Sequence, residues 1–312
     1  MVGAWIGMQA YSTARVVRLR NALFARCGTI SDFDWKPDTA PAAFLQETGV
    51  PSSRFCDAVE KLDLRSCASD WDRALRISEH LAIHAQDLGP IQSDLEATYS
   101  RILAGHGYCA DFVKVFLGLA YAAGIFSRQW SFSYNGFGGN GHTIVEIFDR
   151  ATGKWIFLDV YNNFHVRDAV TAAPLGALEF RDALLRGSSD IKIVPNGEGR
   201  LGYPIEEKLL AYFRQGLQEW HLTCGNAVFS YEANLLIRWS RSVSGTLGQI
   251  VSLYIGQRPS IQILATPENT ARVNDLMALD RSFRLATVAF AVLLLLLIGQ
   301  LSVYGIPSRQ GQ

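Results

Sequence analysis

The chain has 312 residues, of which 49% are hydrophobic, so it can bury a sizeable core and general disorder is excluded. Its 29 basic and 29 acidic residues give a formal net charge of zero, so no overall field attracts nucleic acid and no such partner is expected. The five cysteines are odd in number and contain no CxxC pair, which fits neither a disulfide framework nor a zinc ribbon.

The first 66 residues are predicted to form a helical lead-in. Residues 1–30 are basic and partly helical, and their four arginines either contact a membrane surface or are simply solvated: Arg15, Arg18, Arg20 and Arg26. No charged segment precedes the mildly apolar opening Met1–Ser12, so we expect no secretory signal. Residues 31–66 carry three prolines between short helical stretches.

A helical pattern runs from Trp71 to about Ala85, with Ser69 or Asp70 as its N-cap. His80 and His84 lie four residues apart on this helix, a spacing that suits a metal ion. The residues between them lack the glutamate of the metalloprotease motif, so an ordinary helix surface is the favoured interpretation and no metal is expected.

The next unit places a cysteine at the start of a buried helix. After the turn at 104–108, Cys109 precedes Ala110–Ala123, which is apolar nearly all round and ends at Gly124. The unpaired N–H groups of a helix N-terminus lower the pKa of a thiol and can hold an oxyanion. The alternative is a buried structural cysteine. His106 either lines the same cleft or has a structural role in the turn.

Three strands are predicted after this helix, at residues 127–134, His142–Phe148 and Lys154–Val160, and the last two form a hairpin. The glycine-rich loop Asn135–Gly141 leads into a strand rather than a helix, so we expect a mobile flap rather than a phosphate cradle. Beyond the hairpin, His165 is interpreted as a loop residue.

The hairpin predicts that a histidine and an aspartate meet. If Phe148 pairs with Gly153, counting back equally along both strands places His142 directly opposite Asp159 on the same face. The carboxylate would orient the imidazole while the other ring nitrogen faces the thiolate of Cys109. A shift of one residue in this assumed register would put the pair on opposite faces. We therefore take Cys109, His142 and Asp159 as the candidate catalytic triad.

Residues 171–284 are predicted to form a mixed α/β extension. Glu206–Trp220 has a helical pattern, and Ser260–Ala265 alternates like a strand. Thr266 as N-cap, followed by Pro267, starts a further helix.

An apolar segment without charge, Leu285–Ile306, lies near the end of the sequence. As a helix it would be about 33 Å long, enough to cross a hydrocarbon core of about 30 Å. A buried core helix is the alternative, but a run with no polar face favours a single-pass membrane span. More arginines precede the segment than follow it, which predicts that residues 1–284 are cytoplasmic and that a short tail, 307–312, lies outside.

Four stretches in order resemble the transglutaminase-like superfamily. They are Gly107-Tyr108-Cys109 opening a helix, Ala123-Gly124-Ile125-Phe126-Ser127-Arg128 leading into a strand, Gly141-His142-Thr143-Ile144-Val145-Glu146-Ile147, and Gly153-Lys154-Trp155-Ile156-Phe157-Leu158-Asp159. The resemblance covers roughly residues 70–165. It implies an α+β, papain-like core in which a helix bearing the nucleophilic cysteine packs on an antiparallel sheet bearing the histidine and the aspartate. Family members commonly have a large residue soon after the histidine and a proline after the aspartate, where this chain has Thr143-Ile144 and Val160. We expect these departures to alter the pocket wall and the strand exit while the triad is kept.

The expected layout is that of a membrane-anchored, bacterial-type member of the superfamily. Its segments are a lead-in at 1–66, a transglutaminase-like core at 67–170, the extension at 171–284, the transmembrane helix at 285–306 and the tail at 307–312.

The resemblance implies a thiol-dependent enzyme, without a cofactor, that cleaves or transfers a peptide or protein amide through a thioester on Cys109. One alternative is a non-catalytic, membrane-tethered binding module that kept the fold. Another is a small-molecule acyl transferase similar to arylamine N-acetyltransferases. That family carries an arginine- and glycine-rich run before its cysteine, and Gly105-His106-Gly107-Tyr108 does not match it.

Overall fold

A mixed sheet of six strands organises the described part of the chain, which in this computed structural model comprises residues 13–91, 93–187, 189–203, 205–243 and 259–304. The strand order is β1-β8-β7-β2-β3-β4, and all neighbours are antiparallel except the parallel pair of β1 with β8. The strands are β1 Ala25–Gly28, β2 Ser127–Ser133, β3 Gly141–Asp149, β4 Lys154–Leu158, β7 Trp220–Thr223 and β8 Ile261–Leu264. A separate two-stranded sheet pairs β5 Phe164–Asp168 with β6 Ile191–Pro195. The large sheet thus takes strands from the lead-in, the core and the extension.

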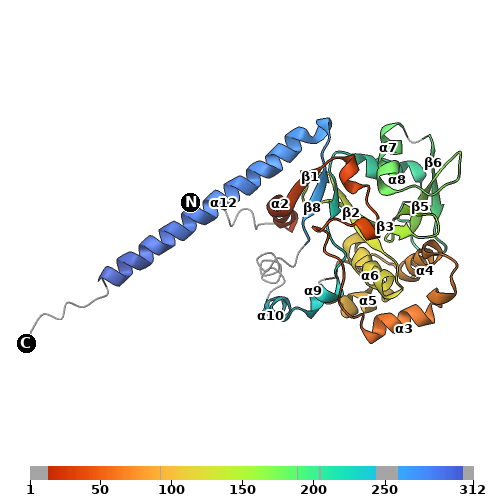
Figure 1. The fold of residues 1–312 in the computed structure, drawn as a ribbon, viewed down its shortest axis with the longest axis horizontal. Coiled ribbons are helices and arrows are strands. Elements are labelled where there is room, and N and C mark those ends of the chain that lie inside the picture. The colour runs from red at the N-terminus through yellow and green to blue at the C-terminus, as the bar shows by residue number, and fades with distance from the viewer. Residues whose placement is uncertain (1–12, 92, 188, 204, 244–258, 305–312) are drawn as a thin grey trace, which may run out of the picture.

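Helices cover both sides of this sheet. Figure 1 shows α3 to α6 grouped on one side of the body and α7 with α8 on the other, while α12 projects away from it. The helices are α2 Thr13–Phe24, α3 Ser53–Lys61, α4 Asp70–Ala82, α5 Leu95–Leu103, α6 Cys109–Ala122, α7 Ala177–Leu185, α8 Glu206–Gln215, α9 Phe229–Ala233, α10 Leu235–Val243 and α12 Thr270–Tyr304. Short 3-10 turns lie at Ile30–Phe33, Pro37–Thr39, Leu64–Ser66 and Pro267–Asn269.

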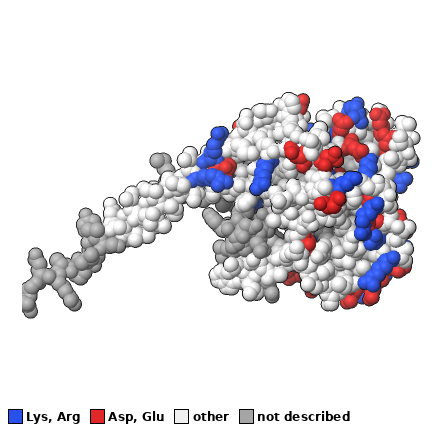
Figure 2. All heavy atoms as spheres, in the orientation of Figure 1, with Lys and Arg blue, Asp and Glu red and all other residues white. Residues whose placement is uncertain are grey.

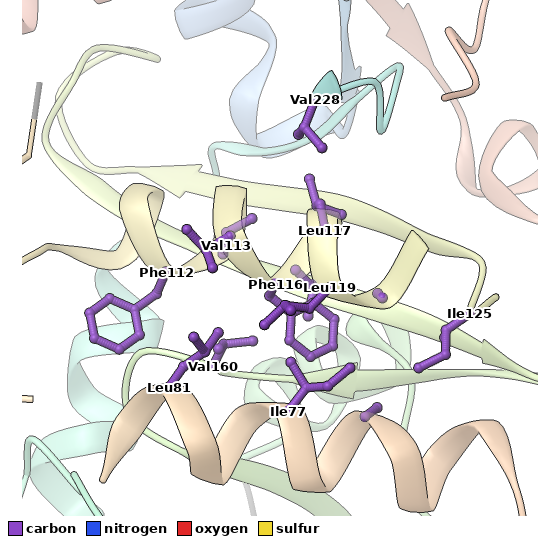
Figure 3. Packing of buried hydrophobic residues seen from close by; sticks show 14 of the residues in the cluster. Ile77, Leu81, Phe112, Val113, Phe116, Leu117, Leu119, Ile125, Val160 and Val228 are labelled. Atoms are coloured by element: carbon purple, nitrogen blue, oxygen red, sulfur yellow. The ribbon is translucent and has the colours of Figure 1, made fainter. Parts of the chain in front are cut away.

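Helix α6 is the centre of the first hydrophobic core. Neighbouring elements surround this helix, so its apolar residues are buried on all sides. Phe112, Val113 and Phe116, for example, are fully buried. Figure 3 shows Phe112 and Phe116 on the side of α6 that faces Ile77 and Leu81 of α4. The side chains of β3 that face α6 are the odd-numbered ones, such as Val145 and Ile147. The expected α+β core, a cysteine-bearing helix packed on an antiparallel sheet, is confirmed.

The opposite face of the sheet carries an aromatic core. Even-numbered positions of β3, such as Ile144, pack there with Phe132 and Phe157 of the neighbouring strands. Phe180 of α7 and Phe213 of α8 close this core, with ring centroids 5.1 Å apart. His142 lies on the same even-numbered face, and Tyr212 and Phe213 of α8 pack beside it there.

The predicted hairpin register is wrong by two residues. The strands close with Asp149 opposite Lys154, and Val145 faces Leu158. The carboxylate of Asp149 accepts bonds from the N–H and hydroxyl of Thr152, at 3.1 and 2.8 Å, which fixes the loop one residue later on each side than expected. Because side chains alternate with a period of two, an error of two residues leaves His142 and Asp159 on the same face.

The predicted helix at 206–220 is also corrected. It ends at Gln215, and Trp220 begins β7, where it pairs with Phe132. Gly216 takes the C-cap position of α8, and the chain then turns back into the sheet.

Helix α12 leaves the body as a single rod of 35 residues, about 52 Å long. The stretch Pro267–Gln300 contains an 18-residue window with a mean hydropathy of 2.2, none of which is buried. The helix is therefore long and apolar enough to cross a membrane. Figure 2 shows acidic and basic side chains intermixed on the body and uncharged residues along the outer described part of α12. The predicted tail, 307–312, and the first 12 residues lie outside the described part of the chain.

Candidate active site

Cys109 stands in the first turn of α6, held there by the turn that precedes it. Gly107 has a φ of +108°, which favours glycine, and a Cβ there would lie 3.2 Å from Phe112. The Asp111 carboxylate accepts hydrogen bonds from the N–H groups of Tyr108, at 2.9 Å, and Ile91, at 3.2 Å. The turn and the helix start are thus tied together, and part of the Cys109 residue stays exposed.

His142 and Asp159 meet beside the end of the hairpin. Nε2 of His142 lies 2.7 Å from Oδ2 of Asp159, and both side chains are buried. The pair is diagonal rather than directly opposite, since Asp159 leaves β4 and forms a bridge with Phe164. This bond occupies Nε2, so Nδ1 is the ring nitrogen left for the thiol.

The side chains of Cys109 and His142 interact, and the interaction shifts the pKa of both. Burial disfavours the imidazolium of His142, but the charge of Asp159 and the bonds to Asp159 and Cys109 outweigh it and raise its pKa to about 10. Burial also disfavours the Cys109 thiolate, yet its bond to His142 and the charge of that ring lower the pKa of the thiol. The two shifts together favour the thiolate–imidazolium form of the pair over its neutral form.

The backbone of β3 adds a further donor. The N–H of Thr143 bonds to the Cys109 sulfur and helps to lower the pKa of the thiol. This edge of β3 faces the thiol because β4 leaves the sheet after Leu158. The predicted triad residues are therefore brought together by the start of α6, the start of β3 and the end of β4.

Asn162, which sequence reasoning did not single out, surrounds the Asp159 carboxylate together with Tyr161. Its side-chain amide donates to Oδ2 of Asp159 at 2.7 Å, and its backbone N–H donates to Oδ1 at 3.0 Å. The N–H of Tyr161 donates to the same Oδ1 at 3.1 Å. An aspartate followed two and three residues later by such donors is a common turn pattern, and that local signal could have identified Asn162.

Four aromatic rings enclose the imidazole, and sequence reasoning identified none of them. Ring centroids of Phe213, Tyr212, Phe132 and Tyr161 lie 5.7, 5.8, 5.9 and 6.0 Å from that of His142. Phe132 and Tyr161 lie close to the hairpin in sequence. Tyr212 and Phe213 come from α8 in the extension, and no local pattern connects them to His142.

The glycine-rich loop before β3 is anchored, in contrast to the flap that we predicted. Phe137, in its middle, is fully buried and packs in a third core with Val273 and Leu276 of α12. The Glu219 carboxylate accepts the N–H groups of Gly136 and Phe137, at 3.1 and 2.7 Å. A large apolar residue among the glycines supplies the burial that holds the loop in place.

Three other histidines, those at positions 80, 106 and 165, have structural partners. His80 bonds to the Tyr99 hydroxyl at 2.7 Å, His106 to the Leu88 carbonyl at 3.1 Å and His165 to the Asn196 side chain at 2.6 Å. Among the described residues, no three His, Cys, Asp or Glu side chains are grouped as a metal ion would require.

A hollow of about 480 Å³ lies at the far end of β3 from His142. Phe148 and Arg150 of the hairpin line it together with Lys36 and Asp38. It contains none of the triad residues, so it is separate from the candidate active site.

One comparison with known proteins covers the part of the chain that carries this site. Residues 63–160 match the family model of the Transglutaminase-like superfamily, a range that includes Cys109, His142 and Asp159. A search of curated proteins finds no match. Among solved structures, a proposed cysteine protease from Cytophaga hutchinsonii is similar, with 18% sequence identity and a TM-score of 0.29. That match covers 54% of each chain, so this chain spans about half the length of its neighbour.

Proposed function

Because residues 63–160 form a transglutaminase-like domain, we propose that this chain is a thiol enzyme that attacks a peptide or protein amide. Cys109 is the nucleophile, His142 its acid–base partner and Asp159 the group that orients the imidazole. One observation carries the proposal: Nε2 of His142 bonds to Asp159 at 2.7 Å while the same ring contacts the Cys109 thiol and lowers its pKa.

In the first half of the reaction, the Cys109 thiolate attacks the carbonyl carbon and forms a C–S bond. The carbonyl electrons move to oxygen, and in this proposal the N–H of Cys109 at the start of α6 holds that oxyanion. The intermediate collapses when the C–N bond breaks. His142 gives its proton to the leaving nitrogen, so an amine departs and a thioester remains on Cys109.

The second half releases the acyl group. His142, now neutral, accepts a proton from water or from an amine as that molecule attacks the thioester carbon. The C–S bond breaks and the Cys109 thiolate reforms beside an imidazolium. Attack by water gives a carboxylic acid, as in a peptidase, and attack by an amine gives a new amide, as in a transglutaminase. Asp159 stabilises the imidazolium throughout, since its carboxylate remains bonded to Nε2.

The site is held at a membrane by α12 in this proposal. The exposed apolar length of the helix supports a single span. Arg281 and Arg284 lie just before its uncharged part, which favours a cytoplasmic body. The substrates would then be proteins or peptides that reach the inner membrane surface.

An acylation experiment tests the proposed activity. The full chain in detergent is mixed with a p-nitrophenyl ester of an N-blocked peptide and quenched in acid after short times. We expect release of about one equivalent of nitrophenol in a fast phase, with the acyl mass located on Cys109. The adduct should then decay, and addition of a primary amine should reveal whether an amide product forms.

Matched variants separate this outcome from chance thiol reactivity. Cys109→Ala should lose the fast phase, whereas Cys67→Ala, which removes another partly exposed thiol, should keep it. Acylation spread equally over the accessible cysteines, or none on Cys109, would reject the enzyme and leave the non-catalytic binding module.

A further inference from the structure

We infer that Tyr212, which lies outside the transglutaminase-like domain, is a positioning residue that holds the His142 imidazole in its reactive orientation. The inference rests on the proposed function and assigns a part of the extension to the active site. Residues 63–160 alone would lack this group.

The extension delivers Tyr212 through the packing of α8. This helix buries Leu209, Leu210 and Phe213 against the aromatic face of the sheet. Tyr212, next to Phe213, is thereby turned toward the start of β3, where His142 stands. The anchor is apolar and extensive, so the position of Tyr212 is set by the core rather than by a flexible surface contact.

The tyrosine hydroxyl fixes the backbone beside the histidine. Oη of Tyr212 donates a hydrogen bond of 2.9 Å to the carbonyl oxygen of Gly141, the residue before His142. Gly141 pairs with Ser133 of β2, and a methyl group at Gly141 would collide with the Phe132 carbonyl. The strand start is therefore clamped between β2 on one side and the hydroxyl of α8 on the other.

The ring of Tyr212 also limits how the imidazole can turn. It meets His142 at an interplanar angle of 68°, and Phe213 meets it at 87°. With Nε2 bonded to Asp159, these walls leave one orientation, in which Nδ1 faces Cys109.

The pKa of Tyr212 is consistent with a neutral hydroxyl that donates a hydrogen bond close to the nucleophile. Burial raises the pKa of the Tyr212 hydroxyl, and the charge of Cys109 raises it further. The hydroxyl therefore stays protonated at neutral pH and can donate to Gly141. Loss of the donor would loosen the imidazole and so weaken its stabilisation of the thiolate.

The test compares Tyr212→Phe with Tyr99→Phe in the full-length protein in detergent. Tyr99 is a matched control because its hydroxyl also makes a partly buried bond, to His80, away from the triad. The readouts are the thermal midpoint and the rate of Cys109 alkylation by iodoacetamide from pH 5 to 9. We expect the midpoint of the rate profile to lie about one pH unit higher in Tyr212→Phe, the shift that loss of about one net hydrogen bond produces. Alkylation should then be up to about tenfold slower than in the wild-type protein at pH values below both midpoints, whereas Tyr99→Phe should keep the wild-type profile.

The possible results are distinct. A wild-type profile in Tyr212→Phe, or the same slowing in both variants with equal losses of thermal midpoint, would overturn the positioning role while leaving the proposed nucleophile intact. An ordinary thiol profile for Cys109 in the wild-type protein would overturn both, since no ion pair would then exist for Tyr212 to position.

Discussion

At the scale of single residues, the surroundings of Cys109 distinguish it from the other cysteines. Burial raises the pKa of the thiols of Cys27 and Cys224, and no charged partner reverses that shift enough to favour their thiolates. Cys109 is also desolvated, but it lies beside an imidazole that Asp159 keeps protonated. The cysteine itself is visible in the sequence. The lowering of its pKa depends on the contact with His142, which becomes visible only in the structure.

Gly107 provides a test of how the turn places this thiol. Alanine at a φ of +108° is strained, and its methyl group would press on Phe112 and Ile91 at 3.2 and 3.3 Å. We expect Gly107→Ala to lower stability by about 1–3 kcal/mol and to displace the start of α6. Alkylation of Cys109 at pH 7 should therefore slow several-fold, measured alongside the thermal midpoint.

Gly124 is the matched control for that substitution. It has a φ of +73°, and a Cβ there would meet nothing within 4 Å. Gly124→Ala should cost about 1–2 kcal/mol from backbone strain alone and leave alkylation unchanged. Equal alkylation rates in the two variants would show that the turn does not position Cys109.

At the scale of elements, the sequence allowed most of the core helices and strands to be predicted. The predicted helix at 110–123 corresponds to α6, Cys109–Ala122, because apolar residues on all sides require a helix surrounded by neighbours. The alternation in 127–134 corresponds to β2, Ser127–Ser133. The meeting of His142 and Asp159 also followed from alternation, despite the wrong register, because an even shift preserves the face.

Other features at this scale depend on contacts that are distant in sequence. The hairpin register is set by the side-chain bonds of Asp149, which hydrophobic alternation does not reveal. The anchored loop at 135–141 depends on Glu219, more than 80 residues away, and on Asn21, whose amide bonds the Phe137 carbonyl at 2.8 Å. Tyr212 reaches the site only because α8 packs on the sheet. Local patterns carry no information on such pairings.

At the scale of the whole molecule, the body and the projecting part of α12 differ in where their apolar side chains lie. The body buries its apolar side chains in three cores, whereas large apolar residues from Leu285 to Ile298 are exposed. The start of α12 belongs to the body, since Val273 and Leu276 pack against Phe137 of the loop before β3. The same helix thus connects the neighbourhood of the active site to the apolar rod.

Truncation after Arg284 tests this division. Because none of the residues from Leu285 to Gln300 is buried, we expect the shortened protein to stay folded, with a nearly unchanged thermal midpoint, and to move from the membrane to the soluble fraction. Leu294→Arg combined with Leu296→Arg is a control of full length, since each arginine at the centre of a span costs about 2.5–3.5 kcal/mol of insertion energy. Both variants should leave the membrane fraction. Loss of the folded state on truncation would instead identify the segment as part of the core.

The central claim is that Cys109 and His142 form a thiolate–imidazolium pair, and the pH dependence of alkylation measures it most directly. An ordinary thiol has a pKa of about 8.5 and loses reactivity about tenfold for each pH unit below that value. The lowered pKa of Cys109 keeps the thiolate at lower pH, and the imidazolium persists until pH rises through about 10, where His142 releases its proton. The two groups titrate as a coupled pair, so the profile reports both.

The measurement follows iodoacetamide modification of Cys109 by mass spectrometry between pH 5 and 9, with a free cysteine peptide as reference. We predict a rate that changes by less than about threefold between pH 6 and 8, while the reference rises about tenfold per unit. His142→Gln should restore the slope of the reference. A wild-type rate for Cys109 that rises in parallel with the reference over this range would contradict the ion pair and, with it, the proposed active site.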